Sequence, residues 1–307
     1  MAFLASFKRA LSGVRRSAGL TAFLFLLPFL VLFVVFRVGP VLASLALSFT
    51  GYDGIGKATW VGLANYRDIL VGTEANTRLF WRSVTNTLYY TVGQVGLEMI
   101  AGLALALLVN SRLLRVKAVW RVAYYIPVVT SAVASSMIWL WLYHPQAGFL
   151  NAALEAIGLS RVAWLSNPST AMLAIIIMAV WSGAGWSMVV YLAGLQGIPQ
   201  SIYEAARIDG ATERQQFIYI TLPLLAPVTL FIVIIGCISA LQVFSQVYVM
   251  TSGGPLNATI TVTYNIWQQG FRYLRLGYSS AMSFLLFLII LLMSILNNRL
   301  FGGSVEY

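Results

Sequence analysis

The sequence has little of what an enzyme active site or a metal site needs. Its 307 residues include one cysteine, Cys237, one histidine, His144, and nine acidic residues spread along the chain. A single cysteine excludes an internal disulfide framework, and these residue types form no group with metal-ligand spacing. We therefore expect no metal, no catalytic residue and no cofactor held by this chain. An integral-membrane enzyme is disfavoured because it would need a nucleophile, a base or metal ligands grouped together.

Charge is also scarce, and apolar residues take its place. Only 9% of the residues are charged, 60% are hydrophobic, and the mean hydropathy is +0.84. A water-soluble domain of this length cannot bury so much apolar surface inside one core. The composition therefore predicts an integral membrane protein.

Six apolar runs are long enough to cross a hydrocarbon core as helices, which takes about 20 residues. Helices are expected because an open sheet edge would leave backbone groups unpaired in lipid, and the alternating pattern of barrel strands is missing. The predicted fold class is all-α integral membrane with six transmembrane helices. The runs cover residues 20–49, 84–110, 122–142, 170–194, 224–250 and 279–298.

The first run, at 20–49, is about twice the length of the apolar region of a signal peptide, so we expect it to be retained. An external loop is predicted at 50–83, before a five-helix core at 84–298. Lys and Arg gather on the cytoplasmic side of membrane proteins, and the short loop at 111–121 holds four basic residues and no acid. This places both ends, residues 1–19 and 299–307, in the cytoplasm. The same distribution accounts for the net charge of +10 without a nucleic-acid partner.

The stretch GYDGIGKAT, at 51–59, is close to a nucleotide-binding phosphate loop. Gly51, Gly56 and Lys57 have the right spacing, but Ala58 replaces the hydroxyl residue that binds magnesium. The predicted orientation also places this stretch outside the cell, and no buried strand precedes it. We interpret it as a polar turn, so another protein would have to hydrolyse ATP.

The longest cytoplasmic loop between the predicted helices has strong helix signals. Two capping-box patterns, starting at Ser201 and Thr212, predict two short helices within residues 195–223. Gly210 lies between them and can adopt the left-handed conformation that ends a helix. Pro223 is expected to end the second helix before the next span.

Within this loop, EAARIDGATERQQFIYITLP resembles the EAA loop of ABC-importer membrane subunits, in which E-A-A is followed after three residues by glycine and later by I-x-L-P. The stretches GLALALLVN, GFLNAALEAIGL, WLSNP, IPQSIYEAARIDGA and VYVMTSGGP resemble the carbohydrate-uptake branch of that family. The similarity covers roughly residues 20–300. The coupling residues that it implies are Glu204, Ala205, Ala206, Asp209, Gly210, Ile220, Leu222 and Pro223.

The resemblance implies a type I importer permease in a bacterial or archaeal plasma (inner) membrane. Its coupling helix would seat in a separate ATPase subunit that holds ATP and magnesium, with Glu204 meeting a basic residue there. The implied partners are a second related permease, two ATPase subunits and an extracytoplasmic binding protein, which would dock near NYRDIL and the GGP at 253–255. The implied substrate is an oligosaccharide, a disaccharide or glycerol-3-phosphate. Considered alone, Glu204 has an alternative role, in which its side chain only completes the capping box that starts at Ser201.

Uncharged polar residues interrupt the later spans and are candidates for a transport path. Amides in hydrocarbon need partners, and amides, hydroxyls and aromatic faces such as Trp186, Phe244 and Tyr248 suit a sugar. The small residues have an alternative role in close helix packing. We expect Trp139, Trp141, Tyr143 and Trp267 to lie at the membrane interface. The resemblance assigns the substrate to Ser135, Ser182, Gly183, Ser239 and Gln242.

Arg37 and Glu98 are the only charged residues inside the six runs. Each costs about 2.5–3.5 kcal/mol near the bilayer centre on insertion scales, and pairing with each other would remove much of that cost. A structural tie is favoured for Glu98, and proton coupling is the alternative. A gradient-driven carrier or channel remains the alternative function, although the scarcity of intramembrane carboxylates argues against it.

Overall fold

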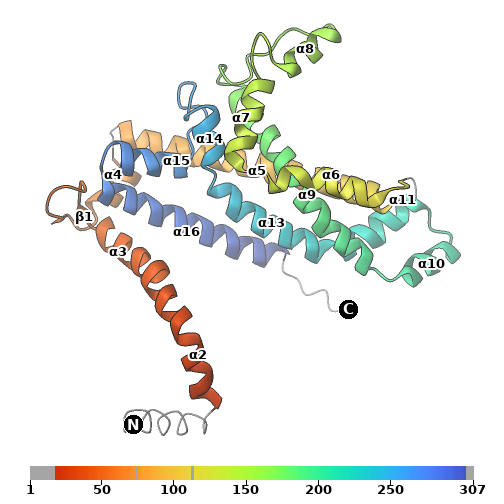
Figure 1. The fold of residues 1–307 in the computed structure, drawn as a ribbon, viewed down its shortest axis with the longest axis horizontal. Helices are drawn as coiled ribbons and strands as arrows, with labels where there is room; N and C mark the ends of the chain where they lie inside the picture. Colours follow the sequence, from red (N-terminus) through yellow and green to blue (C-terminus); the bar gives the residue numbers. More distant parts are fainter. Residues whose placement is uncertain (1–17, 73–74, 112–113, 302–307) are drawn as a thin grey trace, which may run out of the picture.

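The computed structural model describes residues 18–72, 75–111 and 114–301, and helices make up most of this part of the chain. The first span is continuous through α2 (Ala18–Phe33), the π-helical turn η1 (Val34–Val38) and α3 (Gly39–Ser48). α3 packs against the last helix, α16 (Leu276–Phe301), whereas α2 extends away from the rest of the molecule (Figure 1). The predicted cytoplasmic ends lie mostly outside the described residues.

A short segment, which the predicted orientation places outside the cell, follows the first span. β1 (Thr50–Gly51) pairs antiparallel with β2 (Thr59–Trp60), and α4 (Ala64–Leu70) comes next. The carboxylate of Asp53 accepts hydrogen bonds from the backbone N–H groups of Gly56 (2.9 Å) and Ile55 (3.1 Å), which lower its pKa. The stretch GYDGIGKAT is therefore a polar turn, as predicted, and it leads into β2 and does not open a helix that could bind a phosphate.

The centre of the molecule is the packing of α5 (Ala75–Asn110) against α9 (Ala171–Gly197), with α13 (Ala226–Leu241) also packed on α5. Small residues allow these helices to approach closely, because a Cβ on Gly102 would lie 2.5 Å from the Cβ of Ser187. α9 is buried deeply because its apolar side chains fill the space between its neighbours.

The third predicted span, 122–142, is not a single helix. α6 (Lys117–Val129) and α7 (Ala132–Leu142) meet at an angle of 99°. Thr130 and Ser131 between them have ψ values of 136°, which are extended and cannot continue a helix. The prediction was wrong here because both residues are short and polar within a long apolar run, which gave no signal of a break.

The fifth predicted span, 224–250, is also divided. The helical path from Glu213 to Leu224 bends by 58° before α13, and α13 ends at Leu241. A separate helix, α14 (Ser245–Met250), follows after Gln242, Val243 and Phe244. This arrangement removes Gln242 from the interior of a helix and places it at a helix end.

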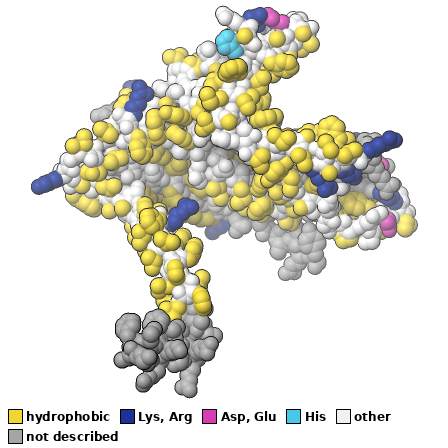
Figure 2. Space-filling model, in the orientation of Figure 1, with side chains coloured by type: hydrophobic (Ala, Val, Ile, Leu, Met, Phe, Trp, Pro, Cys, Tyr) yellow, Lys and Arg dark blue, Asp and Glu magenta, His cyan; other side chains and the backbone are white. Residues whose placement is uncertain are grey.

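The remaining helices are short, apart from the long α16. In the described part of the chain, four unbroken helices are long and apolar enough to cross a membrane, and the two bent pairs raise the number to six. Apolar side chains cover much of the visible surface (Figure 2), as expected for a lipid-facing protein. The predicted all-α membrane fold is confirmed. The short elements are α8 (Phe149–Ala156), α10 (Gln200–Ile208), α15 (Val262–Trp267) and η3 (Gln268–Arg272).

Candidate functional site

The predicted coupling loop begins with α10, which is exposed at one end of the molecule (Figure 1). Pro199 is the N-cap, so Ser201 lies inside the helix and the predicted capping box at Ser201 is wrong. The helix starts earlier than predicted, directly after Pro199, whose ring fixes its own φ angle.

The helix ends at a glycine turn, as predicted. Gly210 has φ +80°, its N–H donates to the carbonyl of Arg207 (3.1 Å), and the N–H of Ala211 donates to the carbonyl of Ala206 (2.8 Å). These two bonds form a Schellman motif, which turns the chain sharply with its carbonyls satisfied.

The second helix of the loop starts at the predicted capping box. The backbone N–H of Gln215 donates to Oγ1 of Thr212 (3.3 Å), and the N–H of Thr212 donates to Oε1 of Gln215 (2.8 Å), at the start of α11 (Glu213–Gln216). The chain then continues through the π-helical turn η2 (Phe217–Thr221) and α12 (Leu222–Leu224).

The helical path that begins at Glu213 ends at Leu224, one residue after Pro223, and the chain bends by 58° before α13. The predicted helix end at Pro223 is therefore confirmed to within one residue. The hydroxyls of Tyr203 and Thr221 lie 2.9 Å apart and tie α10 to η2. The two short helices therefore form one connected unit that leads directly into α13.

The predicted coupling residues form an accessible surface on this unit. Glu204 has no hydrogen bond or ion pair among the described residues, so its carboxylate is free for a partner. A groove between the two helices is lined by Asp209, Gly210 and Tyr219. Sequence reasoning missed Ile208, a large apolar side chain that is 86% exposed beside this groove. Of the other members of the set, Ala205, Leu222 and Pro223 are exposed, and Ala206 and Ile220 are half-buried.

The five predicted substrate residues lie in two groups. Ser135 on α7 is buried and Ser182 on α9 is half-buried, and neither hydroxyl has a hydrogen-bond partner among the described residues. Gly183 follows Ser182 on α9. Ser239 and Gln242 are both exposed at the C-terminal end of α13. The hydroxyl oxygens of Ser135 and Ser182 are enclosed in this conformation, whereas Ser239 and the Gln242 amide are open to a polar solute.

Aromatic rings gather directly after Gln242. The rings of Phe244, Tyr248, Tyr264 and Trp267 have centroids 5.0–6.3 Å apart. Trp267 is therefore part of this aromatic group. Tyr248 remains 43% exposed, so part of this aromatic group is accessible at the surface.

Two of the predicted interface aromatics lie in the core instead. Trp139 and Tyr143 are 8% and 2% exposed, and the Tyr143 hydroxyl donates to the carbonyl of Ala174 (2.9 Å). Trp139 also packs against Trp181 with ring centroids 5.7 Å apart. The bend before α7 packs this helix against α9 and buries both side chains. Nothing in the sequence indicated this bend. Trp141 is 81% exposed and is compatible with the interface.

Glu98 is buried between α5 and α9. Nε2 of Gln94 donates to Oε2 of Glu98 (3.1 Å), and Oγ of Ser187 donates to Oε1 (2.8 Å). A Cβ on Gly183 would lie 2.5 Å from Oε2, so the backbone of α9 packs directly on the carboxylate. Arg37 is exposed on the first span and has no partner among the described residues, so the pairing of Arg37 with Glu98 is wrong. Glu98 instead joins the two central helices.

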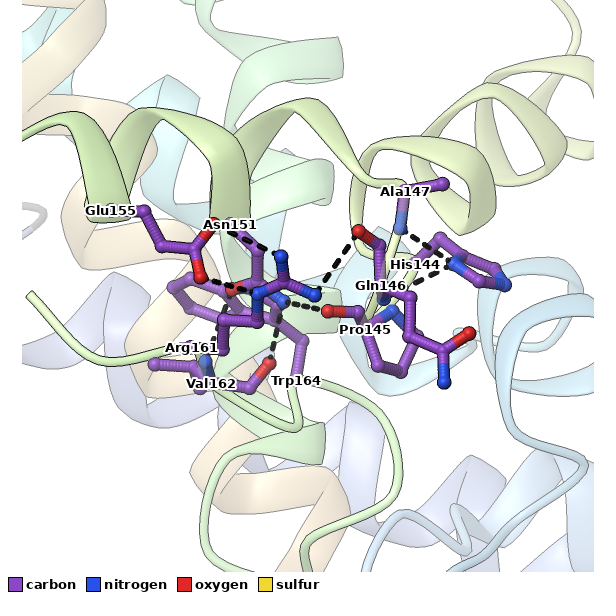
Figure 3. Close-up of polar contacts among 9 residues, drawn as sticks. All are labelled: His144, Pro145, Gln146, Ala147, Asn151, Glu155, Arg161, Val162 and Trp164. Carbon is purple, nitrogen blue, oxygen red and sulfur yellow. Dashed lines mark hydrogen bonds and ion pairs between the residues drawn. The ribbon is translucent and has the colours of Figure 1, made fainter.

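An arm that includes α8 projects from the end of α7 (Figure 1). It is called the external arm below because the predicted orientation places it outside the cell. The buried Asn151 side chain holds it together, because Nδ2 donates to the carbonyls of Pro145 (3.1 Å) and Val162 (3.0 Å). Its Oδ1 accepts from the N–H of Val162 (3.0 Å) and from Nε1 of Trp164 (3.1 Å). Figure 3 shows the Asn151 side chain between Pro145 on one side and Val162 and Trp164 on the other.

An ion pair joins α8 to the segment that follows it in the arm. Nε of Arg161 lies 2.5 Å from Oε1 of Glu155, and Nη1 of Arg161 also donates to the carbonyl of Gln146 (3.3 Å; Figure 3). Arg161 lowers the pKa of the Glu155 carboxyl, so the pair is ionised at neutral pH. Nδ1 of His144 accepts from two backbone N–H groups, so this histidine has a structural role in the turn.

Comparison with known proteins identifies the class. Residues 98–301 match the family described as binding-protein-dependent transport system inner membrane component, and the chain belongs to this family. It is 38% identical over 273 residues to the trehalose/maltose transport system permease protein of Thermococcus litoralis, covering 88% of this chain and 89% of that one. It is 32% identical over 283 residues to the arabinooligosaccharides transport system permease protein of Bacillus subtilis (strain 168), covering 92% and 88%.

The fold is also that of a solved importer. A crystal structure of a bacterial ABC transporter involved in the import of alginate, an acidic polysaccharide, contains a chain with a TM-score of 0.82 and 24% identity. The match covers 97% of this chain and 100% of that chain. The resemblance to ABC-importer permeases is thus confirmed, and the protein is a membrane-spanning permease subunit.

The first prediction concerns the contact between Gly183 and Glu98. Gly183→Ala places a methyl group against the carboxylate and displaces it from Gln94 and Ser187, so we expect a lower melting temperature in detergent. A loss of about 1 kcal/mol corresponds to roughly 2–4 °C for a protein of this size. Gly197→Ala on the same helix is the control, because a Cβ there meets nothing within 4 Å. Equal melting temperatures for the two variants would contradict this packing.

The second prediction concerns the external arm. Asn151→Ala removes four part-buried hydrogen bonds, each worth about 0.5–1.5 kcal/mol. Amide hydrogen exchange over residues 145–164 should then be at least about tenfold faster, with exchange in α5 and α9 unchanged. The exposed Gln146→Ala serves as the control in the same segment, because it removes an amide with no side-chain hydrogen bond. Unchanged exchange in the Asn151 variant would show that the arm is held by other contacts.

Proposed function

We propose that this permease subunit imports a sugar or a related polar solute, using ATP hydrolysed by separate subunits. The substrate would be an oligosaccharide, a disaccharide or glycerol-3-phosphate, delivered by an extracytoplasmic binding protein. The named sugar specificities of the two relatives support this, since each aligns with about nine-tenths of the chain. The coupling loop, with its free Glu204 carboxylate, is the single observation that carries the proposal.

The loop would dock in a groove of an ATPase subunit that binds ATP and magnesium. Glu204 would meet a basic residue of that subunit, and the exposed Ile208 would add apolar contact. Two such ATPase subunits would serve this chain and a second, related permease. Both chain ends and the loop would lie in the cytoplasm, which agrees with the four basic residues at 111–121.

Movement of the docked loop would be transmitted to the membrane helices as a rigid body. The Tyr203–Thr221 contact fixes α10 to the helical path, and this path continues with one bend into α13. Because α13 packs on both α5 and α16, a shift at the loop reaches the central helices without passing through a flexible linker.

The solute would pass the end of α13, beside the two groups of candidate residues. The Gln242 amide can both donate to and accept from sugar hydroxyls, and the exposed Tyr248 ring suits the apolar face of a sugar ring. Ser135, Ser182, Gly183 and Ser239 would complete the polar lining. Outside the membrane, the binding protein would dock near α4, the turn at 253–255 and the Asn151 arm.

The coupling role is tested by neutralising matched carboxylates. In the complete transporter reconstituted in vesicles, Glu204→Gln should lower ATP-driven uptake by about tenfold or more, as expected for loss of a charged hydrogen bond worth about 1.5–3 kcal/mol. Glu213→Gln removes an exposed carboxylate from the same loop and should change uptake by less than about twofold. Equal uptake in the two variants would refute docking through Glu204.

The proposed transport path is tested at the side-chain amide of Gln242, the residue that follows α13. Gln242→Ala should lower the uptake rate by about fivefold, the equivalent of one hydrogen bond of about 1 kcal/mol, while the binding protein still stimulates ATP hydrolysis. Asn110→Ala, which removes an exposed amide at the end of α5, is the control. Normal uptake by the Gln242 variant would place the path elsewhere.

A further inference from the structure

A pocket of about 660 Å³ lies where α4 packs on the starts of α5 and α16 (Figure 1). Its lining includes Leu63, Arg67, Asp68, Asn76 and Arg275, and none of the predicted coupling or substrate residues. The predicted orientation places this pocket on the outer side of the membrane. It is therefore separate from both the coupling loop and the candidate transport path.

Hydrogen bonds between the elements hold the walls of this pocket in place. Oγ1 of Thr77 on α5 donates to the carbonyl of Asp68 on α4 (2.6 Å), and the N–H of Gly277 on α16 donates to the carbonyl of Tyr52 (3.1 Å). A Cβ on Gly72 would lie 2.7 Å from the carbonyl oxygen of Asp68, so the backbone after α4 packs closely as well. The pocket is thus formed before a partner binds, which lowers the entropic cost of binding.

The Arg275 side chain is positioned at this pocket by two contacts. Its Nη1 donates to Oε1 of the buried Gln269 (3.4 Å), and its Cζ lies 4.6 Å from the centroid of the Tyr278 ring. The preceding residue, Leu274, has φ +55°, a left-handed conformation that is uncommon for leucine. Such backbone conformations are concentrated at functional sites, because the surrounding structure has to maintain them. The turn before α16 therefore indicates that the position of Arg275 matters.

Arg67 adds a second guanidinium to the pocket. Its side chain is exposed and has no hydrogen bond or ion pair with any described residue. The carboxylate of Asp68 is also without a partner among these residues, although it lines the same pocket. Two arginines at one pocket suit a carboxylate, because its two oxygens can accept parallel hydrogen bonds from a guanidinium.

The other lining groups favour a polypeptide over a lipid phosphate or a free anion. The Asp68 carboxylate would repel a ligand that offers only acceptors, whereas a polypeptide has N–H donors beside its acidic side chains. Leu63 and Val71 line the same pocket and are 67% and 76% exposed. Apolar side chains next to arginine are typical of the central part of a protein–protein interface.

The charge of the outer side is consistent with an acidic partner. The segments predicted to lie outside, 50–83, 143–169 and 251–278, contain seven basic and four acidic residues. One of these acidic residues, Glu155, is already paired with Arg161. A surface with excess positive charge attracts a negatively charged protein and increases its rate of association.

We propose that this pocket receives an aspartate or glutamate side chain of the extracytoplasmic binding protein, with Arg275 and Arg67 as the two cationic contacts. This inference rests on the proposed function, which supplies that partner, and it assigns one pocket and one kind of side chain to the docking. Arg275, which is held in place by Gln269 and Tyr278, would bind the carboxylate. Arg67 would add a second contact, and Asp68 would accept from an N–H of the same segment.

The test uses the complete transporter in nanodiscs and the purified, solute-loaded binding protein that stimulates its ATP hydrolysis. Arg275→Glu should raise the concentration of binding protein that gives half-maximal stimulation by about tenfold or more, because a carboxylate would oppose the incoming acidic side chain. Arg67→Glu should shift it in the same direction. Arg272→Glu reverses an exposed charge outside the pocket lining and should change it by less than about twofold. Gel filtration of each complex separates a docking defect from a folding defect.

A compensating change in the partner identifies the contact. Among binding-protein variants with single surface acids changed to lysine, one should restore half-maximal stimulation of the Arg275→Glu transporter to near its wild-type concentration. An unchanged concentration for Arg275→Glu would overturn the proposal. A shift that occurs in anionic phospholipid and not in phosphatidylcholine would overturn it in favour of a lipid headgroup.

A solute site gives a different result. Altered uptake of solute by Arg275→Glu in vesicles, with an unchanged half-stimulating concentration of binding protein, would also overturn the proposal. Uptake by the wild-type complex that requires ATP and the binding protein tests the proposed function separately, because such uptake can persist when this pocket has no role in docking.

Discussion

The hydrocarbon core of the membrane contains no water to bond with polar groups, and this constraint determines most of the structure. Backbone groups are satisfied within helices, and intramembrane side chains need partners from the protein. Glu98 obtains two, from Gln94 and Ser187, and in doing so joins α5 to α9. Gly183 is required at the point where the α9 backbone packs on the carboxylate. A single buried carboxylate thus determines the spacing of the two central helices.

Some polar side chains in the predicted spans have no partner within the chain, and these positions are also informative. Ser135 and Ser182 have hydroxyls without partners, and Gln242 presents its amide at the end of α13. Arg37 has a full charge and no counter-ion among the described residues. Of these groups, the Gln242 amide and the Arg37 side chain are exposed on the surface of this chain. Polar groups that the chain leaves unsatisfied are positions where a solute or a neighbouring molecule would have to supply the partner.

Much of the fold could be predicted from the sequence, because span length and the glycine turn are local properties. Six long apolar runs predicted six spans, and Gly210 predicted a left-handed turn that only a residue without Cβ adopts easily. The capping box at Thr212 could also be predicted, because it depends only on residues within one helical turn. The bend at Thr130 and Ser131 could not be predicted, because two short polar residues in an apolar run are also compatible with a straight helix. The partners of Glu98 depended on helix packing, which no local pattern encodes.

The Schellman turn at Gly210 has a consequence for the evolution of such transporters. Its hydrogen bonds join main-chain atoms, and a second tie, Tyr203 to Thr221, lies behind the exposed face. The shape of the loop is therefore encoded separately from the residues that an ATPase would touch. If an ATPase docks on this loop as proposed, mutations at Glu204, Ile208 or Asp209 would change which ATPase is recognised and leave the geometry of the loop unchanged. One motor could then be shared among several permeases, or exchanged, through surface substitutions alone.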